Sequence, residues 1–206
     1  MFGFDQGMIF RIPALLVALT VHEYAHARAA VALGDLTPKF LGRLTLNPVA
    51  HLDPIGLIML WLFRFGWAKP VPVNYRNFKN GRQGVMLVSL AGPAANIITA
   101  FVSMLAMGLL AKIGFLPLVL ERILWLTFSY NIVFAIFNLI PVPPLDGSKI
   151  LMSLLPGRQA YAFERLEPYG PIILIALVYL GVIGTITYPL EVMVSTLIRG
   201  LVTIII

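Results

Sequence analysis

The stretch TVHEYAHARAA, residues 20–30, contains two histidines and a glutamate whose types and spacing could do hydrolytic chemistry. His22 and His26 are four residues apart, so on an α-helix they project from one face about one turn from each other. A single zinc ion can bridge two imidazoles at this spacing. A glutamate in the position of Glu23 binds no metal in such an arrangement and transfers protons as a general base. The stretch therefore predicts a metal centre carried by a helix.

These three ionisable groups lie in a run that otherwise has the character of a membrane helix. A chance match to the pattern, or a polar contact between helices, is the alternative interpretation. Each ionisable group at bilayer depth costs about 2.5–3.5 kcal/mol on insertion scales, so it needs a compensating role. A bound cation would supply that role, which favours the metal centre.

A catalytic zinc ion needs a third protein ligand, with the fourth position left to water. The chain has no cysteine and three histidines, so the third ligand must be a histidine or a carboxylate. Asp146 follows an apolar segment in the proline-rich turn FNLIPVPPLDGSKI, which could hold its carboxylate rigidly beside another helix. The leading candidates are His51 and Asp146, followed by Asp53, Asp35, Glu164 and Glu167.

The composition is that of a membrane protein. Of the 206 residues, 59% are hydrophobic and 12% are charged, which is outside the usual mix of soluble domains. The net charge of +6 comes from bases spread through short loops, which argues against nucleic acid as a partner and fits a positive-inside bias. The N-terminal run lacks the basic start and cleavage site of a signal peptide, so we expect it to stay in the membrane.

The elements that must position these residues are helices. We expect one integral membrane domain over residues 1–206, an all-α polytopic protein with about five to six transmembrane helices of about 20 residues each. Residues 36–67 should form a re-entrant or interfacial region, because the apolar part 55–67 is too short to cross. Short strands are expected at 36–46 and 70–78. The helices are expected at about 8–33, 85–110, 115–140, 171–188 and 190–206, the last of them spanning rather than lying at the interface.

The distribution of bases predicts the orientation. The 34–84 connection carries seven lysines and arginines, whereas the 111–122 connection carries Lys112 and Arg122, so the former should face the cytoplasm. The histidine-bearing half of the first helix and the loop after Ile140 then lie on the same side. We therefore expect a multi-pass protein of the plasma membrane with its active site toward the cytoplasmic side.

Four motifs in a fixed order make the chain resemble the site-2 protease family of intramembrane zinc metalloproteases, in particular its compact prokaryotic branch. They are HEYAH at 22–26, NPVAHLDPIG at 47–56, SLAGPAANI at 89–97 and NLIPVPPLDG at 138–147. The resemblance implies that His22, His26 and Asp146 bind one zinc ion per chain and that Glu23 is the general base. It also implies that Asn138 holds the substrate backbone or stabilises the developing oxyanion.

Two further residues are candidates for auxiliary or substrate-binding roles. His51 could be a fourth ligand, a hydrogen-bond donor to the tetrahedral intermediate, or a loop histidine that orders the turn at 47–56. Asn96 lies in AGPAAN, where small residues let helices approach closely in lipid, and it could bond a neighbouring helix or the substrate. Asp53 fits a structural residue of an Asp-Pro turn.

The expected activity is hydrolysis of peptide bonds within or near transmembrane segments, as in regulated intramembrane proteolysis. A membrane-protein or peptide substrate and the lipid bilayer are then the partners, and the sequence indicates no oligomeric state. The alternatives are a catalytically inactive membrane scaffold and a divalent-metal transporter. A transporter needs a chain of polar residues across the bilayer, and the segments 85–110 and 115–140 contain few of them.

Overall fold

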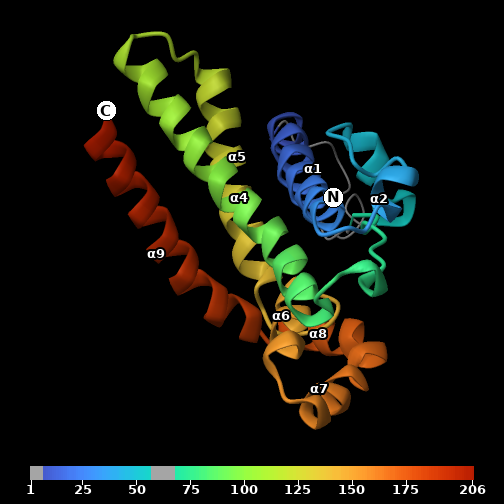
Figure 1. Ribbon diagram of the computed structural model, residues 1–206. Coiled ribbons are helices and arrows are strands. Elements are labelled where there is room, and N and C mark those ends of the chain that lie inside the picture. Colours follow the sequence, from blue (N-terminus) through green and yellow to red (C-terminus); the bar gives the residue numbers. More distant parts are fainter. Residues whose placement is uncertain (1–6, 57–67) are drawn as a thin grey trace.

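The computed structural model describes residues 7–56 and 68–206, and every named element in these ranges is helical (Figure 1). The long helices are α1, α4, α5 and α9, and shorter helices fill the connections between them. In chain order the elements are α1 Met8–Ala32, α2 Thr37–Phe40, η1 Pro48–His51, η2 Tyr75–Asn77, α4 Gly81–Lys112, α5 Leu118–Asn138, α6 Asp146–Leu154, α7 Gly157–Glu164, η3 Glu167–Tyr169, α8 Gly170–Tyr179 and α9 Val182–Ile205.

The four long helices form the body of the protein. Helices α4 and α5 pack along each other, α1 packs against both, and α9 covers both from another side (Figure 1). Each of the four is long and apolar enough to cross a bilayer. The expectation of an all-α polytopic membrane protein is thus confirmed, with four candidate spans among the described residues.

Small residues bring α1 close to α4 and α5. The alanines at positions 14, 18, 27, 30, 100 and 135 are fully buried, whereas large aliphatic side chains such as Ile98 and Ile204 are exposed on the outside of the bundle. In lipid this division is favourable, because apolar side chains gain nothing by turning inward and small ones allow close backbone contact. Between α4, α5 and α9 a larger cluster fills the space, formed by Ala100, Met104, Phe128, Ile132, Ile136, Ile198 and Val202.

The structure corrects the expected division of the chain after residue 170. The predicted helices 171–188 and 190–206 meet instead at Leu180 and Gly181, between α8 and α9. Gly181 has a φ of 74°, the left-handed conformation that ends α8 and that glycine adopts without steric cost. Pro189, where the sequence suggested a boundary, lies inside α9. Helix α8 has 10 residues, about 15 Å, so it is too short to span, and residues 7–56 and 68–206 do not contain the expected five to six spans.

The strands expected at 36–46 and 70–78 are also wrong. Residues 36–46 form α2 and turns, and residues 70–74 form neither helix nor strand before η2. The one bridge among the described residues joins Leu52 to Ala68 in antiparallel fashion. Pro70 and Pro72 lack the amide hydrogen that a strand ladder needs, which explains the failure of the pattern. The apolar part of the expected re-entrant region, residues 57–67, lies outside the described residues.

The connection from α5 to α9 folds into α6, α7 and α8 at the end of the bundle where α4 begins (Figure 1). Two glycines allow this tight packing. A Cβ atom at Gly147 would collide with the backbone of Leu139 and Ile140, and one at Gly170 would lie 2.5 Å from the carbonyl oxygen of Pro143. Asp146, the first residue of α6, is therefore held directly against the end of α5.

Asp35 ties the segment after α1 to the segment that precedes α4. Its fully buried carboxylate accepts hydrogen bonds from the Asn74 amide at 2.8 Å and the Asn77 side chain at 2.7 Å, as well as from the amide and hydroxyl of Thr37. Burial alone would raise the pKa of this carboxyl, but the hydrogen bonds from Thr37, Asn74 and Asn77 hold the pKa below its ordinary value. The ionised form is therefore the one that the fold stabilises.

We expect Asp35→Ala to lower the free energy of unfolding by at least about 2 kcal/mol at neutral pH, because buried donors lose a charged acceptor. The pKa is lower in the folded state, so this stabilisation is complete above the pKa of the unfolded chain, about 3.9 for aspartate, and is lost as the pH falls below it. Unfolding in mixed micelles at neutral and acid pH measures the difference. Glu164→Ala, at an exposed carboxylate of α7, is the control and should change stability by about 0.5 kcal/mol or less. A penalty for Asp35→Ala that is the same at both pH values would contradict this role.

Candidate metal centre

Three side chains from two helices converge at one point inside the bundle. The Nε2 atoms of His22 and His26 lie 2.9 Å apart, and the Oδ2 atom of Asp146 lies 3.1 Å from the first and 3.0 Å from the second. All three residues are buried, and within 7–56 and 68–206 they are the one group of histidines and carboxylates close enough to share an ion. Of the candidates for a third ligand, the structure thus brings Asp146 to the histidine pair.

Hydrogen bonds on the far side of each imidazole fix which nitrogen carries the proton. The Nδ1 atom of His26 lies 2.7 Å from the carbonyl oxygen of Val88, which can only accept. The Nδ1 atom of His22 lies 2.7 Å from Oδ1 of Asn96. Both imidazoles therefore donate from Nδ1, and in its neutral form each keeps a lone pair on its Nε2 atom.

The orientation of the Asn96 amide follows from its other contacts. Its Nδ2 atom donates to the carbonyl oxygen of Ala18 at 2.9 Å and to Oδ1 of Asn131 at 2.8 Å. Asn131 in turn donates from its own Nδ2 atom to the carbonyl oxygen of Thr127. Since both amide hydrogens of Asn96 are used in this way, its Oδ1 atom is the acceptor that faces His22. Asn96 and Asn131 are fully buried, so this chain of bonds from α5 through α4 to α1 is shielded from solvent.

Gly92 provides the room that the two rings need. A Cβ atom at this position would lie 2.5 Å from Nε2 of His26 and 2.6 Å from Cε1 of His22. Any larger residue at position 92 would therefore displace the imidazoles. The glycine of the AGPAAN motif thus serves the histidine pair directly, in addition to the close helix packing expected from the sequence.

The arrangement fits a cation. Two lone pairs and a carboxylate oxygen point at one another in a buried place, and the Oδ2 atom of Asp146 has no hydrogen-bond donor among the described residues. Two imidazole nitrogens and a carboxylate oxygen are a common ligand set for catalytic zinc, with bonds of about 2.0–2.2 Å.

Glu23 lies beside this centre at the edge of a hollow. Its Oε2 atom accepts a hydrogen bond from the amide of Val71 at 3.0 Å. The hollow has a volume of about 120 Å³, enough for several water molecules. It is lined by the three converging residues and by Glu23, Pro70, Val71, Val73, Tyr75, Val88, Ser89, Asn138, Pro144 and Lys149. The general-base candidate and the ligand candidates therefore share one solvent-sized space.

Asn138 also lines the hollow, as its predicted role requires, and its Nδ2 atom donates to the carbonyl oxygen of Phe134 at 3.0 Å. Tyr75, Ser89 and Lys149 also line the hollow, although they were not among the site residues expected from the sequence. For two of them a signal was present in the spacing: Lys149 follows Asp146 by three residues on α6, and Ser89 precedes Gly92 by three residues on α4.

His51 lies apart from the converging group and orders its own loop. Its Nε2 atom donates to the carbonyl oxygen of Thr45 at 2.8 Å, and its own carbonyl accepts from the amide of Lys69 at 2.9 Å. The buried guanidinium of Arg43 donates to the carbonyl oxygens of Lys69 and Pro70. Of the three options for His51, its contacts match the loop histidine. The bonds from His51 and Arg43 to residues 69 and 70 also hold this backbone over Glu23, which accepts a hydrogen bond from the amide of Val71.

The other carboxylates have structural surroundings. Asp53 accepts a hydrogen bond from the amide of Gly56 at 2.8 Å, as expected for an Asp-Pro turn. Asp35 is occupied by the bonds described above, and Glu164 and Glu167 are exposed on α7 and η3. None of these four belongs to the group that could hold an ion among the described residues.

Comparison with known proteins gives consistent results. Residues 115–180 match the model of Peptidase family M50. The chain is 41% identical over 175 residues to "Putative zinc metalloprotease YwhC" of Bacillus subtilis, covering 82% of this chain and 80% of that protein. It is 31% identical over 176 residues to "Putative zinc metalloprotease Rip2" of Mycobacterium tuberculosis, covering 81% and 65%. It is 39% identical over 105 residues to "Putative zinc metalloprotease MJ0611" of Methanocaldococcus jannaschii, covering 47% and 49%. No solved structure matches the chain significantly.

We expect Asn96→Ala to weaken zinc binding about 10–100-fold, because His22 loses the partner that fixes its orientation and its proton. Competition with a chelator, read out by metal content of the purified protein, measures the affinity. Thr99→Ala on the same helix is the control, since the Thr99 hydroxyl bonds the carbonyl oxygen of Ala95 and no ligand candidate among the described residues. Equal zinc affinities of the two variants would show that Asn96 does not position the ligand.

Proposed function

Because the chain belongs to peptidase family M50, the site-2 protease family, we propose that it is an intramembrane zinc metalloprotease that hydrolyses peptide bonds within or near transmembrane segments of membrane proteins. The family and the four apolar helices make it a membrane metalloprotease. The observation that carries the proposal is the convergence of the His22 and His26 lone pairs with the Asp146 carboxylate beside Glu23.

In this proposal His22, His26 and Asp146 hold one zinc ion. When bound, zinc polarises the carbonyl of the scissile peptide and favours ionisation of the attacking water. Glu23 accepts the proton of that water as the oxygen bonds to the carbonyl carbon, and it then delivers the proton to the leaving amine. The Oε2 atom of Glu23 already accepts one hydrogen bond from Val71, which holds the carboxylate at the edge of the hollow.

The substrate must present its backbone in an unwound form. A peptide carbonyl inside a helix is engaged by the amide four residues later, so neither the attack nor the binding of its oxygen is possible until that bond opens. The lining of the hollow includes Pro70, Val71 and Val73, from the non-helical segment before η2. Asn138, the last residue of α5, lines the same hollow, which supports a role for its side chain in contacting the substrate backbone.

The depth of the site supports cleavage within the membrane. Ser89 and Gly92, which face the hollow and the histidine pair, follow Gly81 by eight and eleven residues, about 12–17 Å along α4. The hydrocarbon core is about 30 Å thick and α4, with 32 residues, is about 48 Å long, so a site at this distance from its start would lie toward one face of the bilayer. The reaction therefore takes place at a depth that the ends of transmembrane substrates can reach.

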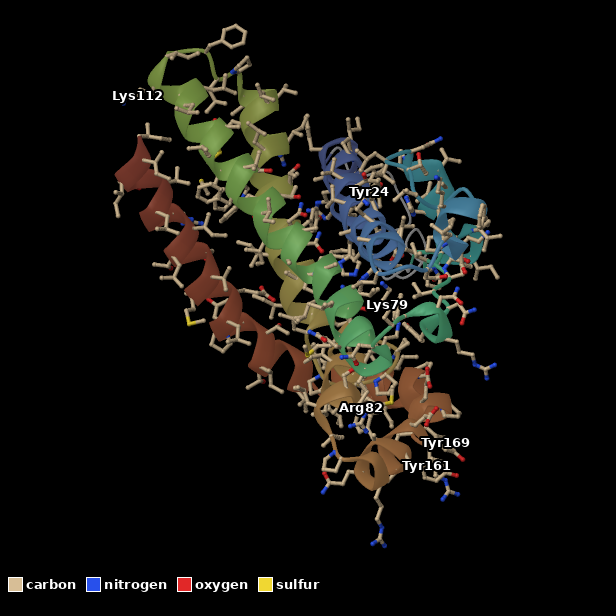
Figure 2. All side chains as sticks on the ribbon, viewed as in Figure 1. Tyr24, Lys79, Arg82, Lys112, Tyr161 and Tyr169 are labelled. Atoms are coloured by element: carbon tan, nitrogen blue, oxygen red, sulfur yellow. The ribbon has the colours of Figure 1, made fainter. Side chains whose placement is uncertain are left out.

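The orientation follows from the bases. Arg82 lies at the start of α4 and Lys79 just before it, whereas Lys112 lies at the other end of the helix (Figure 2). With four spans, the end that carries Lys79, Arg82 and the connections rich in lysine and arginine should face the cytoplasm. The active site would then open toward the cytoplasmic side of the cell membrane.

The rival functions are not favoured. A metal transporter needs polar groups that line a route through the bilayer. The buried asparagines Asn96 and Asn131 instead bond to each other, to backbone carbonyls and to His22. An inactive scaffold function does not require a general-base candidate next to three converging ligand candidates, so the presence of Glu23 at the hollow favours an enzyme.

We expect Glu23→Gln to keep its zinc but to lower the rate of cleavage of a transmembrane substrate by about 100-fold or more, because the amide cannot accept the proton. Zinc content by elemental analysis and cleavage in detergent by mass spectrometry measure the two properties. Glu121→Gln, at an exposed position at the start of α5, is the matched control and should behave as the wild type. Cleavage by Glu23→Gln at the wild-type rate would remove Glu23 from the mechanism.

A further inference from the structure

The hydroxyl of Ser89 is a buried polar group without a partner. Ser89 lies on α4, is 1% exposed and lines the hollow beside the histidine pair. Its Oγ atom has no hydrogen-bond partner among the described residues. Leaving a buried donor unpaired costs about 1–3 kcal/mol, so such a group in a folded protein needs an explanation.

The conformation of Ser89 differs from that of the other hydroxyls on the same helix. The Thr99 hydroxyl donates to the carbonyl oxygen of Ala95 at 2.8 Å, and the Ser103 hydroxyl donates to that of Thr99 at 2.8 Å. A hydroxyl in the middle of a helix usually bonds the carbonyl four residues earlier in this way. Ser89 does not use the equivalent carbonyl of Val85. Its hydroxyl is therefore left free for a group that enters the hollow.

Besides Oγ of Ser89, the Oδ2 atom of Asp146 at the same hollow is buried and has no hydrogen-bond partner among the described residues. Among the described residues the buried side-chain atoms without a partner are Nε of Arg43, Oγ of Ser89 and Oδ2 of Asp146. The Asp146 oxygen is explained by the metal that it would bind together with His22 and His26. The Ser89 hydroxyl, which is a donor, requires an acceptor in the same space.

The register of α4 fixes where this donor lies. Ser89, Gly92 and Asn96 are spaced by three and four residues and so share one face of the helix. Asn96 bonds Nδ1 of His22, and Gly92 packs against both imidazoles. Val88, next to Ser89, accepts the bond from Nδ1 of His26. The Ser89 hydroxyl thus lies one turn further along the face that holds the two ligands, at the hollow where the substrate must enter.

We propose that Ser89 is a further catalytic residue, whose hydroxyl donates a hydrogen bond to the carbonyl oxygen of the scissile peptide as that oxygen becomes an oxyanion. The inference rests on the proposed function. As the water oxygen bonds to the carbonyl carbon, the π electrons of the carbonyl move onto its oxygen and Glu23 takes the proton of the water. When the carbon–nitrogen bond breaks, those electrons re-form the carbonyl and the nitrogen takes the proton from Glu23. A donor aimed at the oxygen stabilises the charged state between these two steps.

The other polar side chains at the hollow have competing demands. Asn138 donates one of its two amide hydrogens to the carbonyl oxygen of Phe134, and the cationic Lys149 is attracted to the carboxylates of the site. A neutral hydroxyl has no such attraction to the carboxylates of the site. Ser89 is therefore the donor most available to bond the substrate oxygen when the substrate binds.

The test compares Ser89→Ala with Ser103→Ala, which removes a buried hydroxyl from the same helix that already has a partner. We expect Ser89→Ala to lower kcat about 100-fold with little change in KM, because the lost bond forms mainly in the transition state. We also expect it to weaken, by a similar factor, the binding of a phosphinic peptide with apolar flanking side chains, whose tetrahedral oxygens imitate the oxyanion. Zinc content should be unchanged, and Ser103→Ala should match the wild type.

The outcomes separate this inference from the proposed function. If the wild type cleaves and Glu23→Gln does not, the function stands, and equal kcat and phosphinate affinity for Ser89→Ala and Ser103→Ala would overturn the role of Ser89. Loss of zinc from Ser89→Ala would overturn it as well, since the hydroxyl would then support the ligands. If the zinc-loaded wild type cleaves no membrane substrate, the proposed function fails. Phosphinate affinity, measured by calorimetry on the full chain, then decides alone whether Ser89 binds an oxyanion.

Discussion

The structure depends on one buried electrostatic constraint, the approach of two imidazole lone pairs and a carboxylate to within about 3 Å of one another. The bonds from Nδ1 to Val88 and Asn96 prevent either imidazole from turning its proton inward. Without a cation, three electron-rich atoms would repel one another in a place that water screens poorly. A bound cation would relieve this repulsion, so the arrangement of the helices that hold these atoms supports a site for a positive ion.

Helix α4 does most of the positioning. One face of it supplies the acceptor for His26, the space for both rings at Gly92, the amide that fixes His22 and the free hydroxyl of Ser89. The segment 69–77 covers the site from outside and is held by buried polar groups, Arg43 at one end and Asp35 at the other. The hydrogen bond from the Val71 amide to Oε2 of Glu23 joins this segment to the general-base candidate. Packing, ligand orientation and substrate access are thus connected through a few buried hydrogen bonds.

The sequence was sufficient to predict the helix with His22 and His26, because a spacing of four residues has one geometric meaning on a helix. For the third ligand the residues alone left His51 and Asp146 as leading candidates, and the resemblance to the site-2 proteases pointed to Asp146. The sequence could not predict the break at Gly181, because both Gly181 and Pro189 were possible boundaries and tertiary packing decides between them. The roles of Asn96 and Ser89 depend on which face of α4 meets α1, and no local pattern shows that. Of the two expected strands, residues 36–46 form α2 and turns. Residues 70–74 are held by the side chains of Arg43, Glu23 and Asp35 rather than by a neighbouring strand.

The central claim is that these residues bind zinc, and an X-ray absorption spectrum at the zinc edge of the purified wild-type protein tests it most directly. We predict a shell of nitrogen and oxygen at about 2.0–2.2 Å with the outer scattering of two imidazoles, and a change of that shell in Asp146→Ala. A protein that retains no zinc, or a zinc shell without imidazole scattering that is the same in Asp146→Ala, would contradict the metal centre.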